Sequence, residues 1–166
     1  MTSDESHITG WDYEWCAFDE VGSIGVFTTA GRGPVPDWLS ANRIEMEKFL
    51  TQLEARSNTG GYVVATHELF DRYPGGTGRA YVGTAHSPIP DTPEATLGLD
   101  DWKRWARLGL YAFDWIDVHR ADNQVGMYEL IMAPEIPLHR DATHDPPTFA
   151  VLPGIAFQRQ HWVRVP

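Results

Sequence analysis

The side chains most able to do chemistry in this sequence lie between residues 139 and 145. His139, Asp141, His144 and Asp145 form its densest group of metal-ligand types, and imidazole nitrogens and carboxylate oxygens are common zinc ligands. No HExxH or CxxC motif and no pair of histidines at helical spacing accompanies them. Because the surrounding prolines indicate a loop, the sequence predicts no metal site.

The candidate nucleophiles are equally isolated. Ser23 lies near a turn, Ser40 is placed to cap a helix and Ser87 precedes a proline, so none sits in a GxSxG motif. Cys16, the single cysteine, lies in an aromatic run that is typical of a strand. A thiol there is expected to be a small buried hydrophobic group rather than a reactive one.

Carboxylate pairs and glycine-rich loops give no stronger signal for catalysis. The acids in Asp19-Glu20 and in Asp100-Asp101 are adjacent in sequence, and a turn and a helix start explain them better than a general acid–base pair. The segment 73–78 is rich in glycine but lacks the lysine and Ser/Thr of a phosphate-binding loop, and no apolar strand precedes it. We therefore expect no catalytic residue, no cofactor and no enzymatic activity.

The charge of the chain is negative and unevenly distributed. Its 166 residues carry a formal net charge of −10. Six acids and no Lys or Arg fall in residues 1–31, and five acids oppose Arg120 alone in residues 109–135. Nucleic acid is a disfavoured partner, because phosphate backbones bind basic surfaces. Two explanations remain open: the general acidity of many soluble proteins, or an acidic face that binds a basic partner.

The sequence also favours a cytoplasmic protein. No apolar stretch approaches the ~18 residues that a membrane span needs, and residues 1–10 are polar and acidic, unlike a signal peptide. One cysteine permits no internal disulfide, which fits a reducing compartment.

Periodicity in the first half predicts a hairpin followed by a helix. Residues 14–18 and 24–29 are aromatic and β-branched runs, and Gly22 between them can supply the turn. A helix is predicted over 41–56, with Ser40 as its N-cap and its apolar face at Met46, Phe49, Leu50 and Leu53. A short strand is predicted from Tyr62, and residues 74–98 are predicted to be mostly loop.

The second half predicts a similar set of elements. A helix is expected over 99–108, a hairpin from strands at 111–118 and 126–132, and two further strands at 149–152 and 157–165. Consecutive hairpins favour antiparallel pairing. We therefore expect a flexible N-terminus at 1–10 and one α+β domain at 11–166, with two helices packed on a mainly antiparallel sheet.

The first hairpin resembles a known sequence pattern. The run W-C-A-F-D-x-x-G-x-I-G-V-F from Trp15, closed by G-R-G-P-V-P at 31–36, is similar to a segment of small bacterial immunity proteins encoded beside secreted polymorphic toxins. The likeness extends loosely to 109–114 and to 128–137. It rests on turn glycines, prolines and core aromatics, so it implies membership of a group of toxin-binding proteins and carries over no catalytic residue.

The resemblance implies that the protein binds and neutralises a cognate toxin with a basic active-site cleft. Acids near the two hairpins would attract such a cleft, and aromatic side chains beside them would anchor it. The residues predicted to contact the partner are Asp19, Glu20, Asp114, Trp115, Asp117, Asp122 and Trp11.

Two alternatives stay open at this point. One is a non-catalytic adaptor or small-ligand-binding domain, whose site would be the loop at 74–98 against the sheet. The other is an unrecognised hydrolase or transferase, which would need a deep pocket where His and Asp side chains converge.

Overall fold

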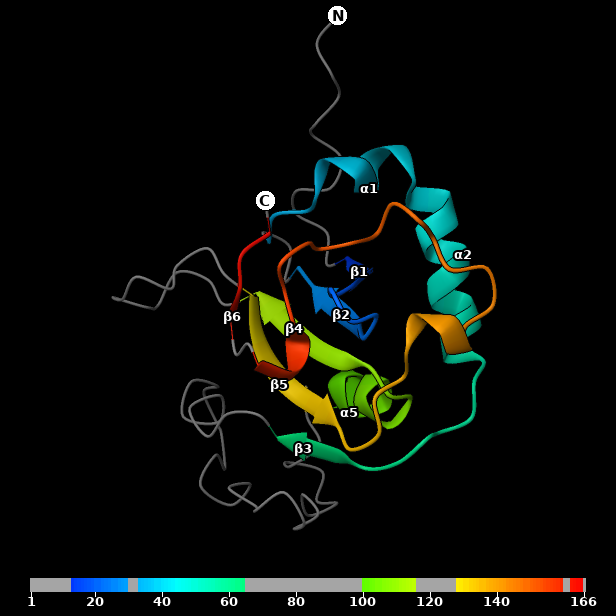
Figure 1. Cartoon of the computed structure of the whole chain (residues 1–166), viewed down its shortest axis with the longest axis vertical. Helices are drawn as coiled ribbons and strands as arrows, with labels where there is room; N and C mark the ends of the chain where they lie inside the picture. Colours follow the sequence, from blue (N-terminus) through cyan, green and yellow to red (C-terminus); the bar gives the residue numbers. More distant parts are fainter. Residues whose placement is uncertain (1–12, 30–32, 65–99, 116–127, 160–161, 166) are drawn as a thin grey trace, which may run out of the picture.

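A mixed β-sheet forms the centre of the molecule, and segments from both ends of the chain contribute to it (Figure 1). The computed structural model describes residues 13–29, 33–64, 100–115, 128–159 and 162–165. Within these ranges the sheet has six strands in the order β1-β2-β4-β5-β3, and β6 also pairs with β5. The strands are β1 (Glu14–Phe18), β2 (Ile24–Thr28), β3 (Tyr62–Val64), β4 (Tyr111–Trp115), β5 (Tyr128–Pro134) and β6 (Trp162–Val163).

The predicted first hairpin is confirmed. β1 and β2 pair antiparallel, and their turn is closed by two backbone bonds, from Asp19 N to Ser23 O at 3.0 Å and from Gly22 N to Asp19 O at 3.1 Å. Gly22 has a φ of +86°, a conformation that costs a glycine little and most other residues considerably more.

The α+β fold is confirmed, and so is the second hairpin. β4 pairs antiparallel with β5, as do β3 and β6. The one parallel contact among the described strands joins β2 to β4. Parallel neighbours need a long connection, and the chain between these two strands includes helices and the strand β3. The connection at 116–127, the N-terminal residues 1–10 and the loop at 74–98 lie outside the described residues.

The first helical region differs from its prediction. A single helix over 41–56 with Ser40 as its cap was expected, but α1 (Asp37–Ala41) and α2 (Arg43–Glu54) meet at Asn42. Pro36 precedes α1 in extended conformation, so the helical region starts several residues early and Ser40 lies inside it. The predicted apolar face is right: Met46, Phe49, Leu50 and Leu53 are all buried.

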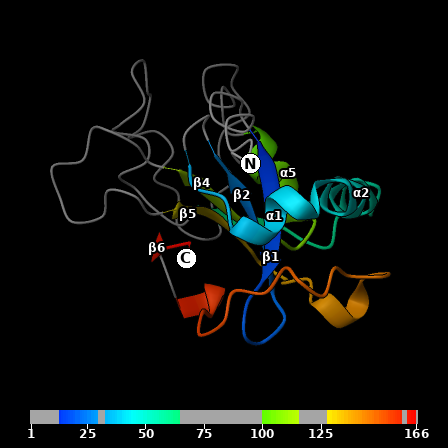
Figure 2. The same ribbon diagram turned by 90° about the horizontal axis from the view of Figure 1, so that it is seen from above.

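Helix α2 and the helix at Asp100–Arg107 cover one face of the sheet, and the C-terminal segment covers the other (Figure 2). Trp38 of α1 lies on the face of the C-terminal segment, where its ring is 5.9 Å from that of Trp15 and 5.4 Å from that of Phe149. On one face, the Met46 sulfur of α2 lies 3.3 Å from Cys16 Sγ of β1. On the same face, α5 (Asp100–Arg107) directs Trp105 Nε1 to Glu14 Oε1 at 3.2 Å. On the other face, a 3₁₀ helix at Phe157–Arg159 (η4) packs the Phe157 ring on the strands.

A row of stacked rings crosses the sheet on the face that Phe157 covers. Trp15, Phe27 and Phe113 sit in register on β1, β2 and β4. Their ring centroids are 4.3 and 4.8 Å apart, with interplanar angles of 11° and 9°. Phe157 meets Phe27 and Phe113 at 5.9 and 5.2 Å. These rings are fully buried, as the alternation of apolar residues predicts for core positions.

The predicted strands at 149–152 and 157–165 are wrong in most of their length. Val151 makes one isolated bridge to Phe18, residues 157–159 are 3₁₀ helical, and β6 is limited to two residues. The aromatic and β-branched residues here pack on the sheet face instead of extending the sheet. Among the described residues, no helix is long and apolar enough to cross a bilayer.

Candidate binding surface at the hairpin tip

The tip of the β1–β2 hairpin is organised by one buried carboxylate. Asp19 is 3 % exposed, and its Oδ1 accepts backbone N–H bonds from Val21 at 3.1 Å and Ser23 at 2.7 Å. Its Oδ2 accepts a third from Phe157 N at 2.9 Å. A charged acceptor makes such bonds stronger than neutral ones. This single side chain therefore fixes the turn and joins it to the C-terminal segment.

Backbone bonds hold the same tip from both sides. Phe18 donates to Ala150 O at 2.7 Å and accepts from Leu152 N at 2.9 Å, while Glu20 donates to Ile155 O at 2.8 Å. Across the turn, Arg140 N donates to Gly22 O at 2.8 Å. Figure 2 shows the orange segment running across the hairpin, with the turn extending beyond it. The tip is thus anchored along its sides and open at its end.

The open end presents an apolar side chain beside a charged one. Val21 is 58 % exposed, and Glu20 next to it is also exposed. A hollow of about 340 Å³ adjoins them, lined by Phe18, Glu20, Val21, His139, Arg140 and Asp141 among others. We call the six residues Phe18, Glu20, Val21, His139, Arg140 and Asp141 the tip surface.

Packing and backbone structure hold Phe18, His139 and Arg140 in place within the tip surface. The Arg140 guanidinium lies 5.1 Å from the centroid of the Phe18 ring, a distance typical of a cation–π contact. Arg140 begins a 3₁₀ helix at Arg140–Ala142 (η3), and Ser23 bridges to His139 just before it. The surface therefore combines an exposed valine, two carboxylates and a held guanidinium on backbone that is already ordered.

The residues predicted to contact a partner occupy different environments. Glu20 is exposed at the tip, as expected. The carboxylate of Asp19, which was predicted to contact a partner, is buried and accepts three backbone N–H bonds. Asp114 is 5 % exposed on the helix-covered face, in register with Thr28 and Glu129, so its carboxylate is also withdrawn from the surface.

Trp115 is partly buried and belongs to a different part of the molecule from the tip. Its ring lies 5.4 Å from that of Tyr128, and it follows Asp114 on the opposite face of β4. Asp117, Asp122 and Trp11 lie outside the described residues. The structure therefore brings none of the predicted residues of the second hairpin to the tip surface within the part of the chain it describes.

Exposed acidic and basic side chains are more evenly balanced than the two acidic segments of the sequence, 1–31 and 109–135, indicate. Over the described ranges, ten carboxylates are exposed, against seven Lys and Arg side chains. Asp19, Asp114 and Glu129 are buried, and Glu14 is half-buried, with its pKa raised by desolvation. The prediction of a broad acidic face therefore finds little support in these ranges, because several acids of the two blocks are interior.

The side chains that could do chemistry remain apart. Cys16 is fully buried, and burial raises the pKa of its thiol well above its ordinary range. In the portion of the chain that is described, no three His, Cys, Asp or Glu side chains gather closely enough to hold a metal ion. The two histidines of the 139–145 group are exposed, and His139 lines the hollow of the tip surface.

Sequence reasoning missed the contribution of residues 139–141 to the tip. From the sequence, His139 and Asp141 are candidates only as metal ligands, and Arg140 has no predicted role. The proximity of these residues to the hairpin depends on the Ser23–His139 bridge, which joins segments far apart in the chain. The exposed Val21 in the middle of a turn was an available signal, because an apolar side chain in that position has no local packing partner.

The described residues form an α+β fold in which the end of the first hairpin is ordered and exposed. Searches against models of protein families, curated proteins and solved structures find no match to the chain.

Proposed function

We propose that this chain is a non-enzymatic immunity protein, which binds a cognate secreted bacterial toxin in the cytoplasm and neutralises it. The single observation that carries the proposal is the tip surface: an ordered hairpin end that exposes Val21 beside Glu20 and a hollow. The resemblance of residues 15–36 to toxin-immunity proteins supports the choice of partner.

The physical argument concerns the cost of binding. Association loses about 0.5–1.5 kcal/mol for each flexible side chain that it immobilises, and more where a loop must become ordered. At the tip, Asp19 and the bonds to residues 140–155 have already fixed the backbone. A partner that covers Val21 therefore gains apolar contact without ordering the loop that presents it.

The charge of the tip surface indicates the kind of partner that it would bind. Glu20 and Asp141 are exposed around the hollow, and among the described residues Glu20 makes no ion pair that would neutralise it. Carboxylates at the rim hasten association with a basic cleft, and a central apolar contact slows dissociation. We propose a toxin domain with a cationic active-site cleft as the occupant, with Asp117, Asp122 and Trp11 as further predicted contacts.

The test uses the toxin-like C-terminal domain encoded beside this gene. We expect co-expression to yield a stable complex and to protect cells from the toxin. The double variant Glu20→Lys/Val21→Ser should weaken the complex at least tenfold, because truncation of central contacts commonly costs more than 1 kcal/mol.

The matched control is Ile44→Ser/Glu45→Lys on α2. Ile44 is 70 % exposed and Glu45 is also exposed, so this pair changes the same residue classes away from the tip surface. Equal affinity of the two double variants would refute the role of the tip. Absence of any complex between the wild-type chain and the neighbouring toxin domain would refute the immunity function itself.

A further inference from the structure

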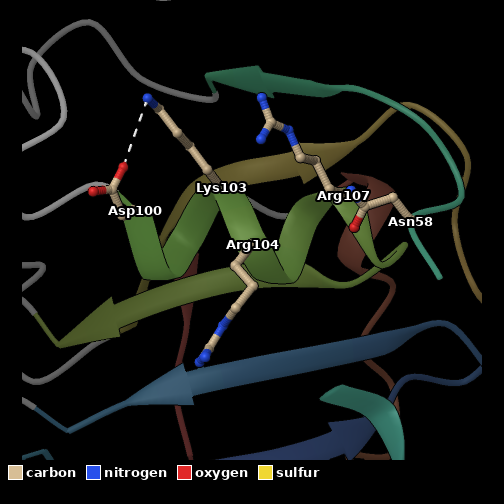
Figure 3. A pocket seen from close by; sticks show the side chains of 5 residues that line it. All are labelled: Asn58, Asp100, Lys103, Arg104 and Arg107. Atoms are coloured by element: carbon tan, nitrogen blue, oxygen red, sulfur yellow. Dashed lines mark ion pairs between the residues drawn. The ribbon is translucent and has the colours of Figure 1, made fainter. Parts of the chain in front are cut away.

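A second hollow lies against α5, and its charge is opposite to that of the protein as a whole. It has a volume of about 260 Å³ and is lined by Asn58, Asp100, Lys103, Arg104 and Arg107 (Figure 3). Three of the five lining residues are thus cations and one is a carboxylate, in a chain of net charge −10. None of these residues belongs to the tip surface, so the hollow is separate from the site proposed above.

The wall of this hollow is held in place by backbone bonds. Thr59 N donates to Arg107 O at 2.7 Å, and Thr59 Oγ1 donates to the same oxygen at 3.2 Å. These bonds join the loop that carries Asn58 to the C-terminal end of α5. The backbone next to Asn58 is thereby held at the end of α5, and the exposed Asn58 amide can act as a donor there.

Lys103 is the most unusual of the lining residues. Its side chain is only 5 % exposed, and its one ion pair with another described residue is to Asp100 Oδ1 at 4.0 Å. The Asp100 side chain is 72 % exposed, so water weakens that attraction. A buried ammonium is costly unless a close anion or several acceptors compensate it. Here the compensation from within the described chain is weak.

Arg107 adds a second positive charge on the same side of the helix. It lies four residues after Lys103, and both side chains extend toward β3 (Figure 3). Its guanidinium lies 5.3 Å from the centroid of the Tyr62 ring, and no ion pair connects it to a carboxylate among the described residues. Like charges at this spacing destabilise a helix, so an anion between them would relieve a repulsion.

Arg104 shows the contrasting arrangement on the same helix. It extends to the other side of α5 from Lys103 and Arg107 (Figure 3). There it pairs with Glu54 at 3.2 Å and approaches Asp101 at 3.8 Å. The chain thus supplies carboxylates for the arginine that faces away and leaves the two cations that face β3 poorly neutralised.

We propose that Lys103 and Arg107, with the Asn58 amide, bind a small anion that carries a phosphate group. A lysine ammonium acts as a point charge and an arginine fork donates two parallel bonds, which together suit phosphate oxygens. Pockets for drug-sized ligands occupy about 300–1,000 Å³, so a hollow of about 260 Å³ fits inorganic phosphate or a short phosphomonoester rather than a nucleotide. Distant carboxylates matter little, because charges beyond about 8 Å are screened at physiological salt.

The experiment measures phosphate binding to the full chain. Inorganic phosphate and glycerol 3-phosphate are each titrated at constant ionic strength, with sodium chloride as reference, by thermal unfolding and by amide chemical shifts. We expect saturable stabilisation by phosphate and shifts centred on residues 58 and 103–107. Tighter binding of glycerol 3-phosphate would identify an organic phosphate as the ligand class, and equal binding would identify the phosphate group alone. An equal response to chloride overturns the proposal.

Variants of the lining residues should change the affinity for phosphate in opposite directions. Arg107→Gln and Lys103→Met should each weaken phosphate binding about tenfold or more, since both remove a charge-assisted bond. Asp100→Asn should strengthen it about two- to fivefold, because it removes the one lining carboxylate. The control is Lys48→Gln on α2, which removes an exposed charge outside the hollow.

The Asp100 variant keeps the test decisive if a cationic variant fails to fold. A purely structural role for Lys103 and Arg107 predicts no gain in phosphate affinity from Asp100→Asn. Unchanged or weaker binding in that variant, or equal losses in Lys48→Gln and Arg107→Gln, overturns the proposal.

Discussion

Replacing Asp19 by alanine should destabilise the protein more than any exposed acidic substitution. The change leaves three backbone N–H groups without their acceptor, and two of them, on Ser23 and Phe157, form buried hydrogen bonds. Each buried donor left unsatisfied costs about 1–3 kcal/mol, so we expect the two buried donors to lower the free energy of unfolding by about 2–6 kcal/mol. Native domains are stable by only about 5–15 kcal/mol, so this loss is a large fraction of the total.

Thermal and chemical unfolding give the assay. A loss of that size should lower Tm by roughly 4–24 °C, because a domain of this length shifts about 2–4 °C for each kcal/mol. Glu20→Ala is the matched control at the next position. Its side chain is exposed and makes no hydrogen bond or ion pair to another described residue, so we expect a change within about 0.5 kcal/mol.

Asp19→Asn distinguishes the roles of the two carboxylate oxygens. The amide can keep the bonds from Val21 and Ser23, but its NH₂ group would then face Phe157 N–H, donor against donor. Hydrogen exchange at the Phe157 amide should therefore accelerate in this variant. Equal stability of Asp19→Ala and Glu20→Ala, or full protection of the Phe157 amide in Asp19→Asn, would refute this account of the hairpin tip.

Three further predictions concern the interior. Glu14→Gln should raise Tm at neutral pH and have no such benefit near pH 4. Desolvation raises the pKa of Glu14 in the folded state, so its contribution to stability is present when the carboxyl is protonated and is lost as the pH rises through the folded pKa. Unfolding curves from pH 4 to 8 check this. Gly25→Ala should cost about 1–3 kcal/mol, since the new methyl would lie 2.9 Å from the Phe157 ring. Adding Phe157→Ala should cost less than the sum of the single changes, and a double-mutant cycle measures the difference. Cys16 should not react with a thiol reagent in native protein and should react fully in denaturant, since it is buried and its thiol pKa is raised; labelling in the native state would contradict its placement.

The parts of the fold that depend on local pattern could be predicted from the sequence. Gly22 between two alternating runs identified the first hairpin, and the spacing of Met46, Phe49, Leu50 and Leu53 identified the buried face of α2. Both signals arise within a few residues of the elements they describe. The start of the helical region was less accessible, since both Pro36 and Ser40 are reasonable beginnings and only packing of the segment chooses between them.

The parts that depend on distant contacts could not be predicted. Asp19 looked like an exposed turn acid because the donor that completes its burial, Phe157 N, is 138 residues away. The parallel pairing of β2 with β4 was missed for a related reason: consecutive hairpins favour antiparallel neighbours, and the crossover depends on where the helices pack.

The acidic blocks show why clustering in sequence does not become clustering in space. Successive side chains on a strand point to opposite faces, so Asp114 lies under the helices while Trp115 lies on the other side of β4. A turn acid can likewise face inward when backbone donors surround it. Net charge therefore indicates the class of partner to consider, but the location of a contact surface depends on which carboxylates remain exposed.

Asp19 connects the fold to the proposed function without belonging to the contact surface. Its two carboxylate oxygens join the hairpin turn to the segment that begins η4. The side chains of Glu20 and Val21, which follow it in the turn, stay exposed. A hairpin end without this carboxylate would have to become ordered upon binding, and that entropy would be subtracted from the affinity of every contact it makes. Asp19 is thus too buried to contact a partner, but it holds the tip in the ordered conformation on which the proposed contact depends.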